Sequence, residues 1–245
     1  MKRTLVWAHR GASAYAPENT LAAFQQAAET GADGIELDVQ KTKDGRLVVI
    51  HDETVDRVSR ASGWVRDFTY EELRKINVNQ HFPQFGIQAV PTLEEVYELI
   101  RPTGLTVNVE LKTGVVFYPE IEEQVLDVTK CMGMQDRVIY SSFNHYSIRK
   151  IRRLQSDAVT GMLYQDGIIG AAEYASKTVQ ANALHPAVFN VQYPDFFKEC
   201  QKYGLKVHVW TVNEANYMRL LCEYGADAMI TNDPKLAKAV ADEYE

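Results

Sequence analysis

The sequence predicts an α/β fold in which alternating strands and helices close into a (β/α)₈ TIM barrel with a small insertion after the second strand. Two observations indicate this fold. The chain has 245 residues, of which 46% are hydrophobic, and such barrels form single domains at this size. Along most of the chain a helical stretch ends at glycine and a short apolar run follows, which is typical of alternating helices and buried strands. We therefore expect one domain over residues 1–245.

Four joints between a helix and the next strand share this pattern. Because a helix commonly ends with glycine in the left-handed conformation, each glycine marks a helix end. The glycines are Gly31, Gly104, Gly204 and Gly225, and the apolar runs after them cover residues 34–38, 105–110, 205–210 and 228–231. Further apolar runs at residues 5–8, 138–141 and 159–163 bring the count to roughly eight strands. That number favours a closed barrel over an open doubly wound sheet, which would also carry a GxGxxG turn after its first strand.

Residues 53–90 do not follow the alternating pattern. They are rich in charged and aromatic side chains, and they lie between strand-like residues 46–50 and helix-like residues 92–100. We predict that this segment, approximately residues 53–90, is an insertion over one end of the barrel.

The composition argues against several classes of function. The formal net charge is −7 and the basic residues are scattered, so we expect no nucleic-acid partner. The three cysteines have no CxxC spacing, which argues against a disulfide framework and a zinc site. The apolar run at residues 4–8 is too short for a signal peptide or a membrane span, so we expect a cytoplasmic protein without stable membrane insertion. A homodimer is the default expectation, because twofold assemblies are common.

Polar residues gather at the predicted ends of the strands, where the active site of a parallel barrel lies. Glu36 and Asp38 are two residues apart in one strand, so their side chains point to the same face, and the same holds for Glu110 and Lys112. Three converging carboxylates repel unless a cation lies among them, and oxygen ligands favour Mg²⁺ or Ca²⁺, with Mn²⁺ as a further candidate. Alternatively, Glu36 and Asp38 are charged residues on an exposed edge strand. Glu110 at the end of another apolar strand favours the metal site.

Two histidines lie at the ends of predicted strands. His9 precedes Arg10, and His51 precedes Asp52. Imidazoles titrate near neutral pH, as general acid–base catalysis requires, so we interpret His9 and His51 as candidate catalytic residues. The other four histidines are expected to be hydrogen-bonded structural residues, namely His81, His145, His185 and His208.

Other polar and aromatic residues allow two interpretations each. Arg10 and Lys112 can donate to a phosphate oxygen or form salt bridges with the nearby carboxylates. Trp210 can offer an apolar wall to a substrate or serve as packing. Asn19 or Thr20 is the expected N-cap of a helix at residues 21–29.

Six short motifs follow one another over nearly the whole chain. They are His9-Arg10-Gly11, Pro17-Glu18-Asn19-Thr20, Glu36-Leu37-Asp38, His51-Asp52, Glu110-Leu111-Lys112 and Trp210-Thr211-Val212-Asn213. In this order the series resembles the glycerophosphodiester phosphodiesterase family of the cytoplasmic bacterial type. The resemblance implies a (β/α)₈ barrel with a small insertion after the second strand, where residues 53–90 fall.

The resemblance also implies an activity, the metal-dependent hydrolysis of glycerophosphodiesters to glycerol 3-phosphate and an alcohol. The implied roles are Glu36, Asp38 and Glu110 as ligands of one divalent cation, His9 and His51 as the acid–base pair, and Arg10 and Lys112 on the phosphate. The order of the two histidines, with His51 as base and His9 as acid, rests on the family alone. The head group and the identity of the cation stay open.

Three alternatives remain beside this interpretation. The first is a barrel phosphodiesterase that acts on lipid, of the lysophospholipase D or phospholipase type. The second is a non-catalytic protein that binds a phosphodiester without turnover. The third is a barrel aldolase or isomerase, for which Lys112 beside Glu110 is a poor candidate for a Schiff-base lysine.

Overall fold

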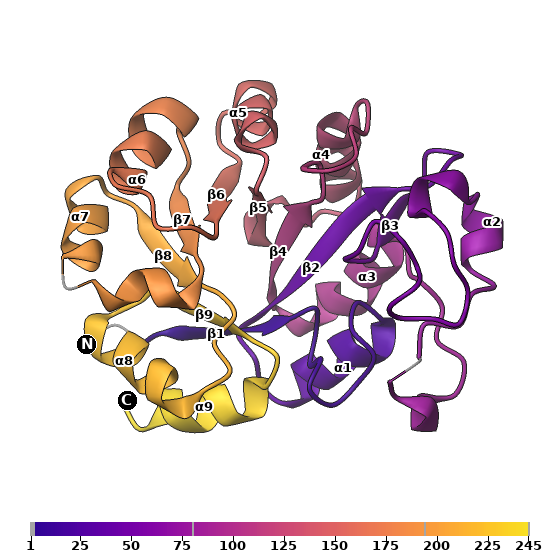
Figure 1. Cartoon of the computed structure of the whole chain (residues 1–245), viewed down its shortest axis with the longest axis horizontal. Coiled ribbons are helices and arrows are strands. Elements are labelled where there is room, and N and C mark those ends of the chain that lie inside the picture. Colours follow the sequence, from indigo (N-terminus) through magenta and orange to yellow (C-terminus); the bar gives the residue numbers. More distant parts are fainter. Residues whose placement is uncertain (1–2, 80, 194, 245) are drawn as a thin grey trace.

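Eight parallel strands close into a barrel in the computed structural model, which describes residues 3–79, 81–193 and 195–244. The strand order is β1-β9-β8-β7-β6-β5-β4-β2, and pairing of β1 with β2 closes the ring (Figure 1). The barrel strands are β1 (Leu5–His9), β2 (Gly34–Lys41), β4 (Thr106–Leu111), β5 (Val138–Ser142), β6 (Val159–Tyr164), β7 (Ala183–Pro186), β8 (Lys206–Val209) and β9 (Ala228–Thr231). The predicted TIM barrel is confirmed.

The strand-like residues 46–50 contain β3 (Leu47–Val49), which pairs antiparallel with the end of β2, with Val49 opposite Val39, and is not part of the ring. One strand of the ring, β7, was not predicted. Its four residues include a histidine and a proline, so no apolar run marks it in the sequence.

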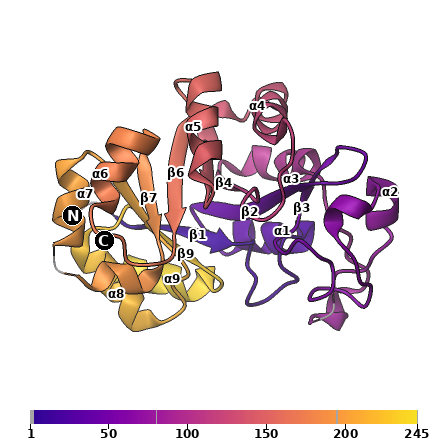
Figure 2. The ribbon, with the colours of Figure 1, turned by 45° about the horizontal axis from the view of Figure 1, so that its top comes forward.

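Helices follow the barrel strands and cover the outside of the ring (Figures 1 and 2). They are α1 (Leu21–Glu29), α3 (Leu93–Ile100), α4 (Ile121–Cys131), α5 (His145–Leu154), α6 (Ala171–Glu173), α7 (Phe196–Lys202), α8 (Ala215–Tyr224) and α9 (Pro234–Asp242), whereas α2 (Tyr70–Leu73) lies in the segment between β3 and α3. Outward side chains of β2, such as Ile35 and Leu37, join the apolar core beneath these helices. Within the described part of the chain, no helix combines the length and apolar character needed to cross a membrane.

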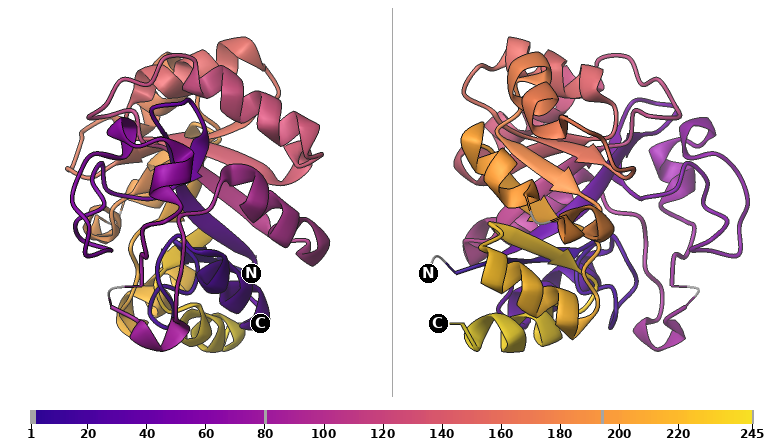
Figure 3. Two further views of the ribbon diagram at one scale, coloured as in Figure 1. Left: turned by 90° about the vertical axis from the view of Figure 1, so that its right-hand side faces the viewer. Right: turned by 60° about the vertical axis from the view of Figure 1, so that its left-hand side comes forward.

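The segment between β3 and α3 forms a small unit beside the barrel. It contains α2 and two short 3₁₀ turns, Val65–Asp67 and Pro83–Phe85. Buried aliphatic side chains of this segment, together with two from the end of the β2–β3 hairpin, make a separate core of Val48, Ile50, Val55, Val58, Val65, Leu73, Val78 and Val90. Figure 3 shows the segment standing to one side of the barrel, away from α6 and α7.

Large rings fill the interior of the barrel. His208 Nδ1 lies 2.8 Å from His185 Nε2, and the ring of Trp7 lies 4.5 Å from that of His208. Gly161 on β6 packs against His185 so closely that a Cβ atom would lie 2.1 Å from Nε2. The absence of a side chain at this position therefore makes room for the buried imidazole pair, which has the structural role expected of these two histidines.

Gly161→Ala should destabilise the protein by about 1–3 kcal/mol, because the added methyl group overlaps His185 in a filled interior. Urea denaturation would measure the change. Gly114→Ala is the matched control, since a Cβ atom there meets nothing within 4 Å. Equal stability of the two variants would show that the interior relaxes freely around His185.

Candidate active site

Three buried carboxylates meet at the carboxyl ends of β2 and β4. Parallel pairing places Asp38 opposite Glu110 and Glu36 opposite Asn108, so these side chains share the inner face of the barrel. One oxygen atom from each of Glu36, Asp38 and Glu110 lies within 4.8 Å of the others. All three residues are buried. The expected convergence of the three acids is therefore present.

Burial and mutual repulsion act differently on the three carboxylates. Burial, followed by the charges of Asp38 and Glu110, raises the pKa of Glu36 well above its usual value. Burial also raises the pKa of Glu110. For Asp38 burial acts in the same direction, but positive charges, first that of Arg10, outweigh it and lower the pKa to about 2. In the protein alone Asp38 is thus stabilised as an ion, whereas Glu36 and Glu110 are not.

Arg10 and Lys112 lie directly beside the carboxylates. The backbone N–H of Arg10 donates to Glu36 Oε2 at 3.0 Å, and its Nε atom lies 3.5 Å from Asp38 Oδ2. Arg10 has a φ of 56°, so the turn after β1 brings both its backbone and its side chain to the site. Lys112 Nζ donates to Glu110 Oε1 at 3.0 Å and lies 3.8 Å from Asp38 Oδ1. Both basic residues therefore lie against the acids.

His9 ends β1 and points into the same site. Its Nδ1 atom lies 2.6 Å from Asn232 Oδ1, so Nδ1–H donates to the amide oxygen and Nε2 faces Glu36 Oε2 at 4.0 Å. Burial and then the charge of Arg10 lower the pKa of His9 to about 4. In the protein alone His9 is therefore neutral at pH 7, with Nε2 available to a ligand.

His51 follows β3 and is oriented by a carboxylate. Its Nδ1–H donates to Asp52 Oδ1 at 2.6 Å. The pKa of Asp52 lies below its usual range, because His51 and then Arg57 donate hydrogen bonds to the carboxylate. The imidazole is thus held with Nε2 free.

One pocket collects most of these groups. Trp210, which follows β8, forms part of the wall of this pocket. Its Nε1–H donates to the backbone oxygen of His185 at 2.8 Å, and its ring lies edge-on to that of Phe143, with 5.4 Å between the ring centres. The pocket is lined by His9, Arg10, Glu36, His51, Asn108, Glu110, Phe143, Leu163, Trp210 and Ile230. Two of the predicted residues, Asp38 and Lys112, lie behind this lining in contact with Glu110 or Arg10.

The donor set fits a hard divalent cation. Asp38 Oδ1 and Asn108 Oδ1 are both buried, and neither has a hydrogen-bond partner among the described residues. Buried acceptors of this kind cost free energy unless a cation or water satisfies them. Three carboxylates and one amide oxygen are ligands that Mg²⁺ and Ca²⁺ prefer.

Several polar residues around the site were missed in the sequence. Asn19 donates from Nδ2 to Asp38 Oδ2 at 2.9 Å, and Thr20, not Asn19, caps α1 by accepting from the N–H of Ala23. Asn232 contacts His9 across 223 positions of the chain, so no local pattern indicates this pair. The alternation of side chains along a strand could have indicated Asn108, because it lies two residues before Glu110.

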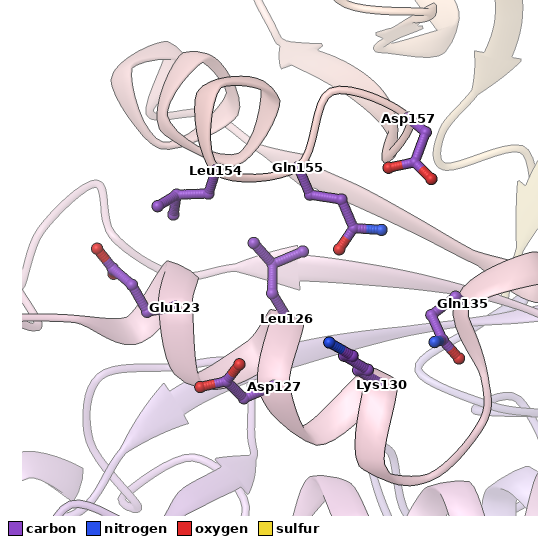
Figure 4. Close-up of a pocket in the computed structure, with 8 residues that line it drawn as sticks. All are labelled: Glu123, Leu126, Asp127, Lys130, Gln135, Leu154, Gln155 and Asp157. Carbon is purple, nitrogen blue, oxygen red and sulfur yellow. The ribbon is translucent and has the colours of Figure 1, made fainter.

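A separate hollow lies between α4 and α5, on the outside of the barrel (Figure 4). It is lined by Glu123, Leu126, Asp127, Lys130, Gln135, Leu154, Gln155 and Asp157. None of the residues predicted for the site lies in it. The pocket at the carboxyl ends of the strands is therefore the stronger candidate for the active site.

Comparisons with known proteins identify the family of the chain. The model of the glycerophosphoryl diester phosphodiesterase family matches residues 9–236. A glycerophosphodiester phosphodiesterase of Caldanaerobacter subterraneus subsp. tengcongensis is 47% identical over 234 residues, covering 95% of this chain and 96% of the relative.

Solved structures give the same result. A glycerophosphodiester phosphodiesterase from Agrobacterium tumefaciens has a TM-score of 0.85 and 27% identity, covering 96% of this chain and 99% of that one. An Oleispira antarctica phosphodiesterase in complex with the product sn-glycerol-3-phosphate has a TM-score of 0.88 and 26% identity, covering 98% and 97%. The chain therefore belongs to the glycerophosphoryl diester phosphodiesterase family and is an enzyme of that family.

Proposed function

We propose that the enzyme hydrolyses soluble glycerophosphodiesters to glycerol 3-phosphate and an alcohol, in a reaction that requires one divalent cation. The observation that carries this proposal is the set of three buried carboxylates beside two histidines and an arginine. The similar Oleispira phosphodiesterase holds sn-glycerol-3-phosphate, which is the product expected here.

Glu36, Asp38 and Glu110 would hold the cation, which we propose to be Mg²⁺ or Ca²⁺, with Mn²⁺ as a further candidate. When bound, the cation would neutralise negative charge on the phosphate and polarise its oxygens. Arg10 is suited to bind a phosphate oxygen, because its buried Nε has no hydrogen-bond partner among the described residues. Lys112 would add a second positive charge at the same place.

His51 would act as the general base. Asp52 accepts from its Nδ1–H, which leaves Nε2 free to take a proton from the attacking hydroxyl group or water. His9 would protonate the leaving alkoxide from Nε2, and a bound anionic phosphodiester would favour the protonated imidazole. Trp210 would pack against the glycerol backbone.

The test is release of glycerol 3-phosphate from glycerophosphocholine by chelator-treated protein, with Mg²⁺, Ca²⁺ or Mn²⁺ added back separately. We expect release only after addition of a cation. If folded protein releases nothing from choline, ethanolamine, glycerol, serine or inositol diesters with any of the cations, the proposal for soluble substrates is wrong.

A second candidate substrate class is lysophospholipid, and one observation favours it. Exposed apolar side chains gather on the loops and first turns that follow β4 to β7, at the carboxyl-end face of the barrel. They are Val115, Phe117, Phe143, Tyr146, Ile168, Ile169, Phe189 and Tyr193. Such a surface can contact an acyl chain when the phosphate is in the site.

Substrate competition separates the two classes. Release of choline from lysophosphatidylcholine and from glycerophosphocholine would be compared for the wild type and a Phe117→Ser/Ile169→Ser variant, in which both replaced side chains are exposed. A lipid substrate predicts a selective loss of the lipid reaction. Activity on the soluble diester alone would exclude it.

A further inference from the structure

A chain of short polar contacts connects the two halves of the site through one arginine of the inserted segment. Arg57 Nε lies 2.6 Å from Asp52 Oδ2, and Nη2 lies 3.2 Å from Asp52 Oδ1. On its other edge, Nη1 and Nη2 donate to the two carboxylate oxygens of Glu18, each at 2.7 Å. Arg57 therefore holds two carboxylates at once, each by two hydrogen bonds.

Each of these carboxylates contacts a residue of the proposed machinery. Asp52 accepts from His51 Nδ1–H at 2.6 Å. Glu18 Oε1 accepts from Arg10 Nη1 at 3.0 Å. The order of contacts is thus His51, Asp52, Arg57, Glu18 and Arg10, and among these five residues only Arg57 lies within the inserted residues 53–90.

We propose that Arg57 is a positioning residue, which fixes the catalytic imidazole of His51 relative to the phosphate-binding guanidinium of Arg10 through Asp52 and Glu18. The inference rests on the proposed function. It gives the inserted segment a role in catalysis, because this segment supplies the residue that joins the two carboxylates.

The geometry explains why an arginine is needed. A guanidinium presents donors on two edges in one plane, so it can bind two carboxylates side by side, whereas the ammonium group of a lysine is a single point charge. The backbone of Arg57 is also fixed in place, since His81 Nε2 lies 3.0 Å from the backbone oxygen of Arg57. Its side chain is 41% exposed, so replacement leaves no cavity in a core.

The test compares Arg57→Ala and Arg57→Lys with Arg74→Ala. Arg74 Nη1 lies 2.6 Å from Glu95 Oε1 and joins α2 to α3, so it makes an equally short ion pair in the same segment. Its polar contacts within the described part of the chain are with Glu95 and Tyr70, and neither of these is a site residue. We expect kcat for glycerophosphocholine to fall about 10–100-fold in Arg57→Ala, as for the loss of other residues that orient a catalytic group, with a smaller change in KM. Arg57→Lys should lie between this variant and the wild type, and Arg74→Ala should match the wild type.

Two further measurements report on positioning itself. Guanidinium ion at millimolar concentration should partly restore kcat in Arg57→Ala and not in His51→Ala. The His51 Nδ1–H proton, identified in ¹H NMR spectra by its loss in His51→Ala, should be visible in the wild type and broadened by solvent exchange in Arg57→Ala.

A kcat in Arg57→Ala within twofold of wild type, or an equal loss in Arg74→Ala, would overturn the inference. If the wild type and Arg57→Ala differ in activity but share the same Nδ1–H signal, the positioning role is also wrong. A failure of the proposed function can be told apart from a failure of this inference. In the first case the wild type itself would be inactive on glycerophosphodiesters, while the NMR signal would still report whether Arg57 orients His51.

Discussion

Replacing His51 by alanine should lower kcat for glycerophosphocholine by about 10²–10⁴-fold, which is the usual contribution of a positioned acid or base. KM should change little, because the proposed role of His51 is proton transfer and the residues proposed to bind the phosphate, Arg10 and Lys112, remain. His9→Ala should cause a loss of the same order. Initial rates at saturating cation, with circular dichroism to verify folding, would measure both effects.

The leaving group distinguishes the roles of the two histidines. A glycerophosphodiester of p-nitrophenol releases a phenolate that needs no proton, so loss of the general acid should matter far less than with choline. We expect His9→Ala to recover most of its activity on this substrate and His51→Ala to remain inactive. The opposite pattern would show that His9 is the base and His51 the acid. Near-normal turnover of glycerophosphocholine by either variant would show that the replaced histidine does not take part in catalysis.

Much of the site could be predicted from the sequence, because its main elements are local. Glu36 and Asp38 lie in one strand, and Glu110 lies in a strand that pairs with it, so alternation and parallel pairing were enough to bring the three acids together. His9 and Arg10 could be placed because β1 is a barrel strand and its carboxyl end faces the same pocket. His51 instead follows β3, which pairs antiparallel with the end of β2 beside this pocket.

The residues that orient the catalytic groups could not be predicted, because they act through contacts between distant segments of the chain. Asn232 orients His9 across 223 positions, and Arg57 contacts Glu18 across 39 positions. No spacing rule connects such pairs. The sequence did not indicate strand β7 for a different reason. A polar residue such as His185 does not suggest a buried strand, yet His185 is fully buried, paired with His208 and accommodated by Gly161.

Glu36→Gln should abolish nearly all cation-dependent activity and yet stabilise the metal-free protein. The amide can still accept from the N–H of Arg10, but it carries no charge for a cation, and it no longer repels Asp38 and Glu110. Removing a penalised buried charge is expected to contribute about 1 kcal/mol, which would raise Tm by about 2–4 °C for a domain of this size. Differential scanning calorimetry after chelation would measure the change, with the exposed Glu98→Gln as control.

The pH dependence fixes the sign of this effect. Because the pKa of Glu36 is raised in the folded protein, ionisation of Glu36 destabilises the metal-free wild type as pH rises above the usual glutamate value. The advantage of Glu36→Gln should therefore be greatest at neutral pH and vanish in acid, where Glu36 is protonated.

Addition of the cation should reverse the order of stability. At a concentration 100 times Kd, a cation bound only to the folded state stabilises it by about 2.7 kcal/mol, or about 5–10 °C in Tm for a domain of this size. The wild type should gain this stabilisation and Glu36→Gln should gain much less. An equal gain in both proteins would show that Glu36 is not a ligand. The crossing of the two stabilities would instead show that the carboxylates are retained for the cation at a cost to the metal-free fold.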